Sequence, residues 1–236
     1  MKEVSYNLMR EERQIEQIKN IKESLESGSA EVSISARDYT GTLIIEPFES
    51  FRSFMKRAAI SDNVKGLHIG SPLGIILSES ALNSSLNYID GLLYSLKFDF
   101  LYKDVCILDY LDGILTMCYS DSCGRCVLCR EGIRQMQKML RAMTTGTSRQ
   151  EDVAILRDVA QGIADGSYCE FGMGVGILVL SALDSFSEEF ENHAFRKRCD
   201  AAVCRKYVTF HILGNCTGCG ECVDTCEEGE IGRAHV

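Results

Sequence analysis

The sequence predicts an α+β protein in which a small mixed unit within residues 1–100 precedes a four-helix bundle and a cysteine-rich C-terminal segment. Short strand-like and helical segments alternate before residue 100, whereas amphipathic helical patterns dominate from Asp104 to Glu191. All 12 cysteines of the 236-residue chain follow Asp104. They indicate metal centres rather than disulfides, because the N-terminal residues lack the apolar segment of a secretory signal.

The first hundred residues combine an exposed helix with a strand-rich unit. Residues 10–26 place four apolar side chains on one helical stripe and charges elsewhere, so this helix is expected to dock on a partner. The stripe consists of Ile15, Ile18, Ile21 and Leu25. Further along, the pattern predicts strands at 31–35 and 42–46, a helix at 49–59 and a strand–turn–strand at 65–77.

Four amphipathic segments with short joins predict the helical bundle. They cover residues 104–118, 130–143, 148–166 and 175–191. Ser148 and Glu151 are predicted to form a capping box at the start of the third helix. Cys106 and Cys118 lie on the apolar side of the first helix and are expected to be core residues.

The stretch SCGRCVLCREG (122–132) places Cys123, Cys126 and Cys129 within seven residues. This spacing lets a tight loop turn three sulfurs toward one point. It is more typical of an iron–sulfur site than of a zinc ribbon, whose cysteines come in separated pairs. The amides at the start of the next helix and the charge of Arg130 favour an anionic cluster there.

Cys169, in the segment GSYCEFGMG, is the expected fourth ligand. The second and third predicted helices form a hairpin, so the loop entering the second and the loop leaving the third lie at the same end of the bundle. The four thiolates then hold a [4Fe–4S] cluster. In the alternative, Cys169 is a buried cysteine and the fourth ligand lies elsewhere. The nearby GMGVG (172–176) follows no predicted strand and is not interpreted as a dinucleotide loop.

A second run, NCTGCGECVDTC, has the C-x2-C-x2-C-x3-C spacing of bacterial ferredoxins. Its cysteines are Cys216, Cys219, Cys222 and Cys226, with Glu227 where proline is usual. In two-cluster ferredoxins the fourth cysteine of a run ligates the other cluster. Three alternatives follow: Cys226 completes a local cluster, another cysteine supplies a sulfur, or the natural chain continues. The last is preferred, because EIGRAHV (230–236) matches a translated sequencing adapter and resembles a read-through tail.

A third group lies between these runs, where His193, Cys199, Cys204 and His211 form the pattern H-x5-C-x4-C-x6-H. Nitrogen and sulfur ligands in this number suit tetrahedral zinc, although the spacing matches no standard zinc finger. Buried or redox-idle thiols are the alternative interpretation.

The net charge of −9 argues against a nucleic-acid-binding protein, which carries concentrated positive charge. The longest apolar run, residues 176–183, is too short to cross a bilayer, so direct membrane insertion is not expected. A cytoplasmic location, peripheral if the chain joins a membrane complex, is expected from the clustered cysteines.

Together these motifs resemble the NADH-binding flavoprotein subunit of respiratory complex I. They also resemble the related β subunits of NAD(P)-linked and electron-bifurcating hydrogenases and of formate dehydrogenases. The cluster domain of that family is similar to the stretch that runs from SCGRCVLCREG through a helical hairpin to SYCEFG. The family's β-grasp-like (SLBB) domain is similar to two stretches further upstream, GTLIIEPFESFRSFMKRAAI and KGLHIGSPLGIIL. RCDAAVC with the ferredoxin run is similar to the C-terminal extension of the hydrogenase β subunits.

The resemblance implies an organisation into six parts. These are an amphipathic helix (1–28), an SLBB domain (29–100), a helical [4Fe–4S] domain (101–192), a linker with a candidate zinc site (193–214), a partial ferredoxin motif (215–229) and a non-native tail (230–236). The family's FMN- and NADH-binding domain should precede the SLBB domain. No residue supplies its glycine-rich loop, so neither FMN nor NAD is expected to bind this chain.

The implied function is that of an iron–sulfur electron-transfer subunit of an NAD(P)H-linked oxidoreductase, without catalytic residues of its own. It would relay single electrons between a flavin on another chain or domain and downstream clusters. The implied partners are flavin- and NADH-binding, thioredoxin-like [2Fe–2S], hydrogenase or dehydrogenase subunits. The alternative is an interaction module that metal merely stabilises and that has no redox role.

Overall fold

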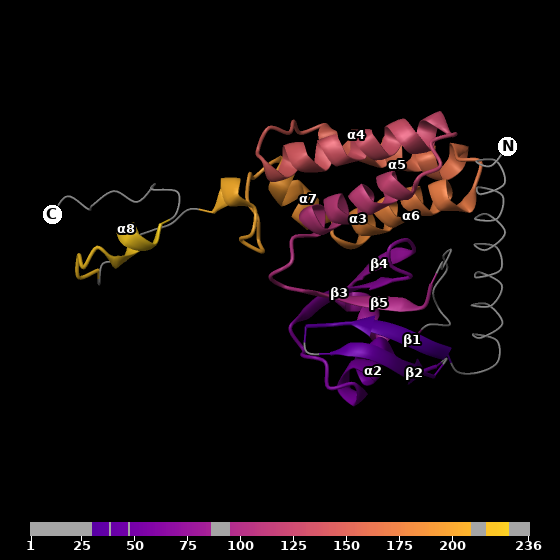
Figure 1. Ribbon diagram of the computed structural model, residues 1–236, viewed down its shortest axis with the longest axis horizontal. Helices are drawn as coiled ribbons and strands as arrows, with labels where there is room; N and C mark the ends of the chain where they lie inside the picture. The colour runs from indigo at the N-terminus through magenta and orange to yellow at the C-terminus, as the bar shows by residue number, and fades with distance from the viewer. Residues whose placement is uncertain (1–29, 38, 47, 86–94, 209–215, 227–236) are drawn as a thin grey trace.

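The computed structural model describes residues 30–37, 39–46, 48–85, 95–208 and 216–226. It has the expected α+β class, with a five-stranded sheet, a group of helices packed beside it, and a C-terminal segment that extends away from both (Figure 1). The helix predicted at residues 10–26 lies outside the described residues.

The sheet has the strand order β2-β1-β5-β3-β4. Only β1 and β5, at its centre, are parallel, and the other neighbours are antiparallel. The strands are β1 (Ala30–Ser35), β2 (Thr40–Ile45), β3 (Val64–Ile69), β4 (Ile75–Ser78) and β5 (Lys97–Tyr102). All but β5 match predicted strands. The KFDFLY sequence of β5 is rich in aromatic residues, which favour strands, but it lies next to the first helical pattern and is missing from the predicted elements.

Helix α2 (Phe51–Arg57) covers one face of the sheet, within the segment predicted as helical. The rings of Phe51 and Phe54 meet Phe98 of β5 edge-on, at centroid distances of 5.8 and 6.1 Å. Ser50 begins the helix, because its side chain accepts a hydrogen bond from Ser53 N at 3.2 Å. The helix thereby closes the core of the sheet unit.

Four longer helices pack against one another beside the sheet (Figure 1). They are α3 (Ile107–Asp121), α4 (Val127–Thr144), α5 (Asp152–Gly166) and α6 (Glu170–Ser185). Their apolar stripes form one core of leucine, isoleucine, valine and methionine side chains. No single described helix is long and apolar enough to cross a membrane. Only α6 together with α7 (Ser187–Ala194) meets that criterion, as a pair bent by 85°.

Two predicted features of these helices are wrong. The capping box does not form: α5 starts after Glu151, which makes no capping hydrogen bond with its side chain, and Ser148 instead accepts a hydrogen bond from Lys197 Nζ at 2.9 Å. The fourth predicted helix is two helices, α6 and α7, which meet at Phe186. The Phe186 ring packs on Gly66 of β3, where a Cβ would lie 2.7 Å from the ring, and the chain bends by 85° between the two helices.

The serines of α6 join the helical unit to the edge of the sheet. Strand β4 is an edge strand, and Ile76 at its centre is fully buried. Ser181 Oγ accepts a hydrogen bond from Ile76 N at 2.9 Å, and Ser185 Oγ donates to Ile76 O at 2.8 Å. The two serines are one helical turn apart, so α6 satisfies the backbone of an edge that would otherwise be open to another strand.

Glycine allows α5 and α6 to approach closely. The GMGVG stretch lies inside α6 rather than in a loop after a strand. A Cβ on Gly176 would lie 2.5 Å from Ala160 O and 2.6 Å from Ala164 N, both backbone atoms of α5. We predict that Gly176→Ala lowers the free energy of unfolding by about 1–3 kcal/mol, because backbone atoms cannot move aside as a flexible side chain can.

Gly113 provides a matched control for this prediction. It is exposed in the middle of α3, and a Cβ there would meet nothing within 4 Å. Gly113→Ala should therefore raise the free energy of unfolding by about 0.5–1 kcal/mol through helix propensity alone. Urea denaturation of both variants measures these changes. Equal effects of the two substitutions would contradict the close approach of α5 and α6.

Candidate metal centres

The cysteine triplet lies where α3 ends and α4 begins. Cys126 is the N-cap residue of α4, one turn earlier than predicted, and Cys129 lies in the first turn of the helix. Gly124 has the left-handed φ of 73° that lets the loop turn tightly. Arg130 Nη1 donates to Gly124 O at 2.8 Å and its Nε to Glu131 at 2.9 Å, so Arg130 holds the loop on the helix.

Cys169 lies at the same end of the helical unit as the triplet. It is the N-cap residue of α6, which begins directly after it rather than several residues later as predicted. A Cβ on Gly166 would clash with Leu128 in the first turn of α4, and one on Gly172 would lie 3.5 Å from Cys129 Cβ. The residues on both sides of Cys169 therefore contact the triplet. We refer to Cys123, Cys126, Cys129 and Cys169 as the cysteine quartet.

The other three thiols of the quartet act electrostatically on Cys129. Burial raises the pKa of Cys129, and negative charge on Cys169, Cys126 and Cys123 raises it further, while a hydrogen bond from Ser122 opposes both. Bringing four thiolates together is costly unless positive charge compensates them. Two helix N-termini, those of α4 and α6, supply part of this compensation, and bound iron would supply the rest.

An unpartnered hydroxyl borders the quartet. Ser167 Oγ is buried and has no hydrogen-bond partner within the described part of the chain. Leaving such a group unpaired costs about 1–3 kcal/mol. A sulfur-rich group bound at the quartet would give this hydroxyl an acceptor. The residues present are therefore suited to an iron–sulfur cluster.

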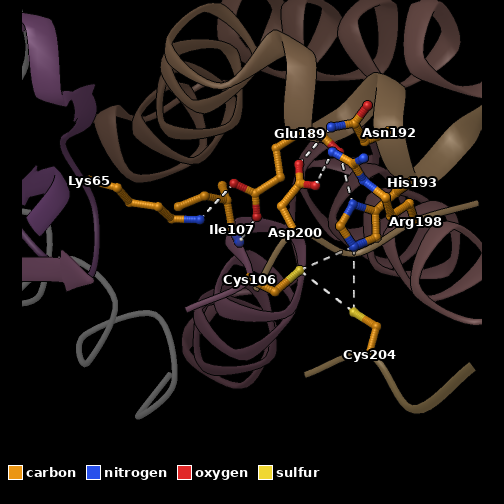
Figure 2. A network of polar contacts seen from close by, with 9 residues as sticks. All are labelled: Lys65, Cys106, Ile107, Glu189, Asn192, His193, Arg198, Asp200 and Cys204. Carbon is orange, nitrogen blue, oxygen red and sulfur yellow. Dashed lines mark hydrogen bonds and ion pairs between the residues drawn. The ribbon is translucent and has the colours of Figure 1, made fainter. Parts of the chain in front are cut away.

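A second group of ligand atoms is more compact. The side chains of Cys106, His193, Cys199 and Cys204 are all buried, and their ligand atoms lie within 4.8 Å of one another. We refer to these residues as the Cys/His group. His193 Nε2 is 3.4 Å from Cys106 Sγ and 3.5 Å from Cys204 Sγ (Figure 2). Among the described residues, only this group has all its ligand atoms so close together, a spacing that suits a single ion. The sulfur atoms of the quartet lie farther apart.

The structure thus brings together three of the four residues predicted to bind zinc. Cys106 is buried, as expected of a core residue, but its sulfur faces His193 and occupies the fourth position of the Cys/His group. His211 lies outside the described residues. Cys106 precedes His193 by 87 residues, so no local spacing connects them. The only local signal is its place as N-cap residue of α3, where a thiolate is favoured.

The hydrogen bonds of His193 leave one ring nitrogen available for a metal. Nδ1 lies 2.8 Å from the carbonyl of Glu189 and donates to it, so Nε2 is the nitrogen that faces the sulfurs and would bind a metal in place of a proton. Burial lowers the pKa of His193, but the hydrogen bond and negative charge of Cys106, the Glu189 carbonyl and the hydrogen bond to Cys199 together outweigh it and raise the value to about 9. The Cys204 thiol and burial raise the pKa of Cys106. A divalent cation would relieve this crowding of acidic groups.

The backbone around Cys199 is held in an unusual shape. Lys197 and Ala202 have φ values of 51° and 54°, the left-handed conformation that costs about 1–2 kcal/mol for residues other than glycine. Asp200 holds this turn by accepting hydrogen bonds from Asn192 at 2.6 Å and Arg198 at 2.5 Å (Figure 2). Tyr207, packed against the His193 ring, donates to Met143 O.

Glu189 connects the Cys/His group to the sheet unit. Its carboxylate accepts from Ile107 N at 2.8 Å, next to Cys106, and pairs with Lys65 of β3 at 2.6 Å (Figure 2). The Lys65 and Glu189 side chains are only 15% and 9% exposed. The pair therefore lies in a largely dry junction between sheet, α3 and α7, where loss of one partner is costly.

The ferredoxin-type cysteines are the least enclosed. Cys216, Cys219 and Cys222 are exposed and Cys226 is half-buried, around the short helix α8 (Glu221–Thr225). The backbone amide of Glu221 lowers the pKa of Cys219. The described residues of this segment lie away from the rest of the protein (Figure 1).

The fold and these cysteine groups define an α+β protein with candidate metal centres, and part of the chain matches a known family. Residues 109–193 match the family model described as the NADH-ubiquinone oxidoreductase-F iron–sulfur binding region. The predicted resemblance to this family is confirmed over that region, and so is the expectation of an iron–sulfur cofactor. Binding of FMN or NAD is not part of the matched region.

Relatives with curated names agree. The chain is 28% identical to the NADP-reducing hydrogenase subunit HndC of Solidesulfovibrio fructosivorans over 69% of this chain and 34% of that one. It is 43% identical to the NADP(+)-dependent formate dehydrogenase subunit beta of Moorella thermoacetica over 29% and 10%. With an NADH-quinone oxidoreductase subunit of Streptomyces coelicolor it shares 35% identity over 34% and 18%. The chain thus spans about a third or less of these relatives.

A solved structure has the same fold. An NAD+-reducing [NiFe]-hydrogenase in the H2-reduced state aligns with a TM-score of 0.64 and 17% identity, over 71% of this chain and 29% of that one. The α+β arrangement is therefore shared with a hydrogenase subunit.

The junction at Glu189 leads to a stability prediction. Lys65→Met leaves a nearly buried carboxylate without its cation, and we expect the free energy of unfolding to fall by about 2–4 kcal/mol. Arg157→Met is the control, because the Arg157–Asp184 pair is exposed (44% and 66%) and should contribute under about 1 kcal/mol. Urea denaturation under anaerobic conditions measures both. Similar losses in the two variants would contradict the special role of the junction.

Proposed function

We propose that this chain is an electron-transfer subunit, or part of one, in an NAD(P)H-linked oxidoreductase, and that the cysteine quartet binds its [4Fe–4S] cluster. The observation that carries the proposal is the convergence of four cysteines at two helix N-termini within the matched iron–sulfur binding region. A bound [4Fe–4S] cluster accepts and releases one electron at a time.

The chain's own residues would hold and shield the cluster. Cys126 and Cys129 are 7% and 4% exposed, whereas Cys123 is exposed, so the site has a covered side and an open one. Val127, Leu128 and Tyr168, which adjoin quartet cysteines in the sequence, are exposed apolar side chains. Burial on one side limits water and sets the potential, and exposure on the other allows a redox partner to approach.

The other domain assignments support this proposal. A helix between β2 and β3 and a parallel pair at the centre of the strand order β2-β1-β5-β3-β4 favour a β-grasp-like (SLBB) domain at 29–100. The packing of α3 to α6 favours a four-helix [4Fe–4S] domain at 101–192. The 193–214 linker and the partial ferredoxin motif at 215–229 would follow.

The names of the relatives suggest the partners. They are subunits of an NADP-reducing hydrogenase, a formate dehydrogenase and an NADH-quinone oxidoreductase. We infer that this chain also works beside other redox subunits, with the flavin on another chain or domain, in the cytoplasm or on the surface of a membrane complex. Cys216, Cys219, Cys222 and Cys226 would bind a second cluster, complete or in part.

The quartet predicts a defined loss of iron. After anaerobic purification, Cys126→Ser should contain about four fewer irons per chain than wild type, with matching loss of acid-labile sulfide. Cys118→Ser is the matched control, because Cys118 is equally buried but lies outside the quartet, and its iron content should not change. Wild-type iron in Cys126→Ser would contradict the proposal. Wild-type iron in Cys169→Ser would instead show that the fourth ligand lies elsewhere.

For the Cys/His group we propose a structural zinc ion. Three thiolates and one imidazole are a common structural zinc set, and all four residues are buried, so no coordination position is open to substrate. The ion would connect the start of α3, helix α7 and the segment that leads to the ferredoxin-type cysteines. This role is compatible with either redox or purely structural function of the whole chain.

The zinc proposal predicts which residues set the metal content. Wild type should contain about one zinc per chain; Cys106→Ser should lose most of it, and His211→Ala should retain it. Elemental analysis by mass spectrometry measures this, with iron counted in the same samples. Zinc that depends on His211 and not on Cys106 would contradict the proposed ligand set.

A further inference from the structure

We propose that Ser167 is a positioning residue for the cluster: its hydroxyl donates a hydrogen bond to a sulfur atom at the quartet and raises the reduction potential. The inference rests on the proposed function, since it requires a cluster at the quartet. It goes further by naming a residue that binds no iron and yet sets the potential.

Ser167 lies in the loop that carries Cys169, close to the side chain of Cys129. It follows the last residue of α5, where its amide donates to Ile163 O at 3.1 Å, and it precedes Cys169 by two residues. A Cβ added to Gly172 would lie 2.5 Å from Ser167 Oγ and 3.5 Å from Cys129 Cβ. The hydroxyl and the Cys129 side chain thus border the same small space. Gly172 keeps that space open, because any side chain there would displace the hydroxyl.

The surroundings of the Ser167 hydroxyl favour a sulfur atom as its acceptor. Ser167 Oγ is buried and lacks a partner among the residues that the structure describes. A buried hydroxyl without an acceptor is unfavourable, and the acceptors that a loaded quartet brings to this space are sulfur atoms. The hydroxyl can rotate toward them without any change in the backbone.

Ser122 shows the same arrangement on the other loop. Its Oγ accepts from Gly124 N at 3.2 Å and lies 3.7 Å from Cys129 Sγ. Since that oxygen already accepts a hydrogen bond, its own proton is available to Cys129. Each of the two loops that carry the quartet therefore places one serine beside it.

A hydrogen bond from Ser167 would stabilise the reduced cluster more than the oxidised one. A reduced cluster carries one more negative charge than the oxidised cluster, so a hydrogen-bond donor at sulfur stabilises it more. Removal of the donor lowers the reduction potential without removing a ligand. Ser167 is a cleaner test of this effect than Ser122, because Ser122 also holds the backbone of the loop.

The test is an anaerobic redox titration of the full chain, followed by EPR, with iron counted in each sample. Ser167→Ala should keep its iron and titrate at a lower midpoint potential than wild type. Ser167→Thr retains the hydroxyl and should titrate near wild type. Ser120→Ala, an exposed serine of α3 whose hydroxyl bonds Thr116 O at 3.1 Å, should not change the midpoint.

Two results would overturn this inference but not the proposed function. The first is a wild-type midpoint potential in Ser167→Ala with full iron content. The second is loss of iron from that variant, because the hydroxyl would then be needed for cluster assembly and not for setting the reduction potential. A wild-type protein without a cluster would overturn the proposed function as well.

Discussion

The antiparallel pairing of α4 and α5 is the constraint on which the cysteine quartet depends. The short connection after Thr144 returns the chain along α4, so the end of α5 packs beside the start of α4. Contacts along this pair confirm the direction: Gly132 near the start of α4 faces Ile163 near the end of α5, and Gly166 faces Leu128. Helix α6 must then begin beside α4. Two helix N-termini meet at one place, and each carries a cysteine as its N-cap residue.

This placement has an electrostatic reason. Free amides at helix N-termini stabilise negative charge, and thiolates need that stabilisation when they are gathered in a partly buried site. The same device recurs in the Cys/His group, where Cys106 is the N-cap residue of α3. Three helices thus begin at proposed metal ligands. The Glu189 carboxylate sits between the Cys/His group and Lys65, so a buried side chain connects that group to the sheet unit.

Local patterns predicted most of what is local in this fold. The triplet spacing identified the loop before α4, and the hairpin argument placed Cys169 beside it. The predictions failed where tertiary contacts decide. The break at Phe186 depends on Gly66 of a distant strand, and Ser148 bonds Lys197 of the C-terminal linker instead of capping α5.

Cys106 shows the limit of motif spacing most clearly. A ligand 87 residues from its partner leaves no spacing signal, and only the return of α7 to the start of α3 brings the two together. Ser167 is similar, because a serine shortly before a cysteine is an ordinary feature of a sequence. Its proposed role rests on the burial of its hydroxyl, on the lack of an acceptor among the described residues and on the glycine opposite it. Residues of this kind can be found only after the chain has folded around them.

The central claim is that the quartet holds a redox-active [4Fe–4S] cluster. Mössbauer spectroscopy of the chain, purified anaerobically from cells grown on isotopically enriched iron, tests it most directly. The account predicts the spectrum of a [4Fe–4S] cluster that changes by one electron on reduction with dithionite and returns on reoxidation. A chain that contains zinc at its cysteines and no iron, or iron only in single-ion sites, would contradict the account and leave a metal-stabilised interaction module.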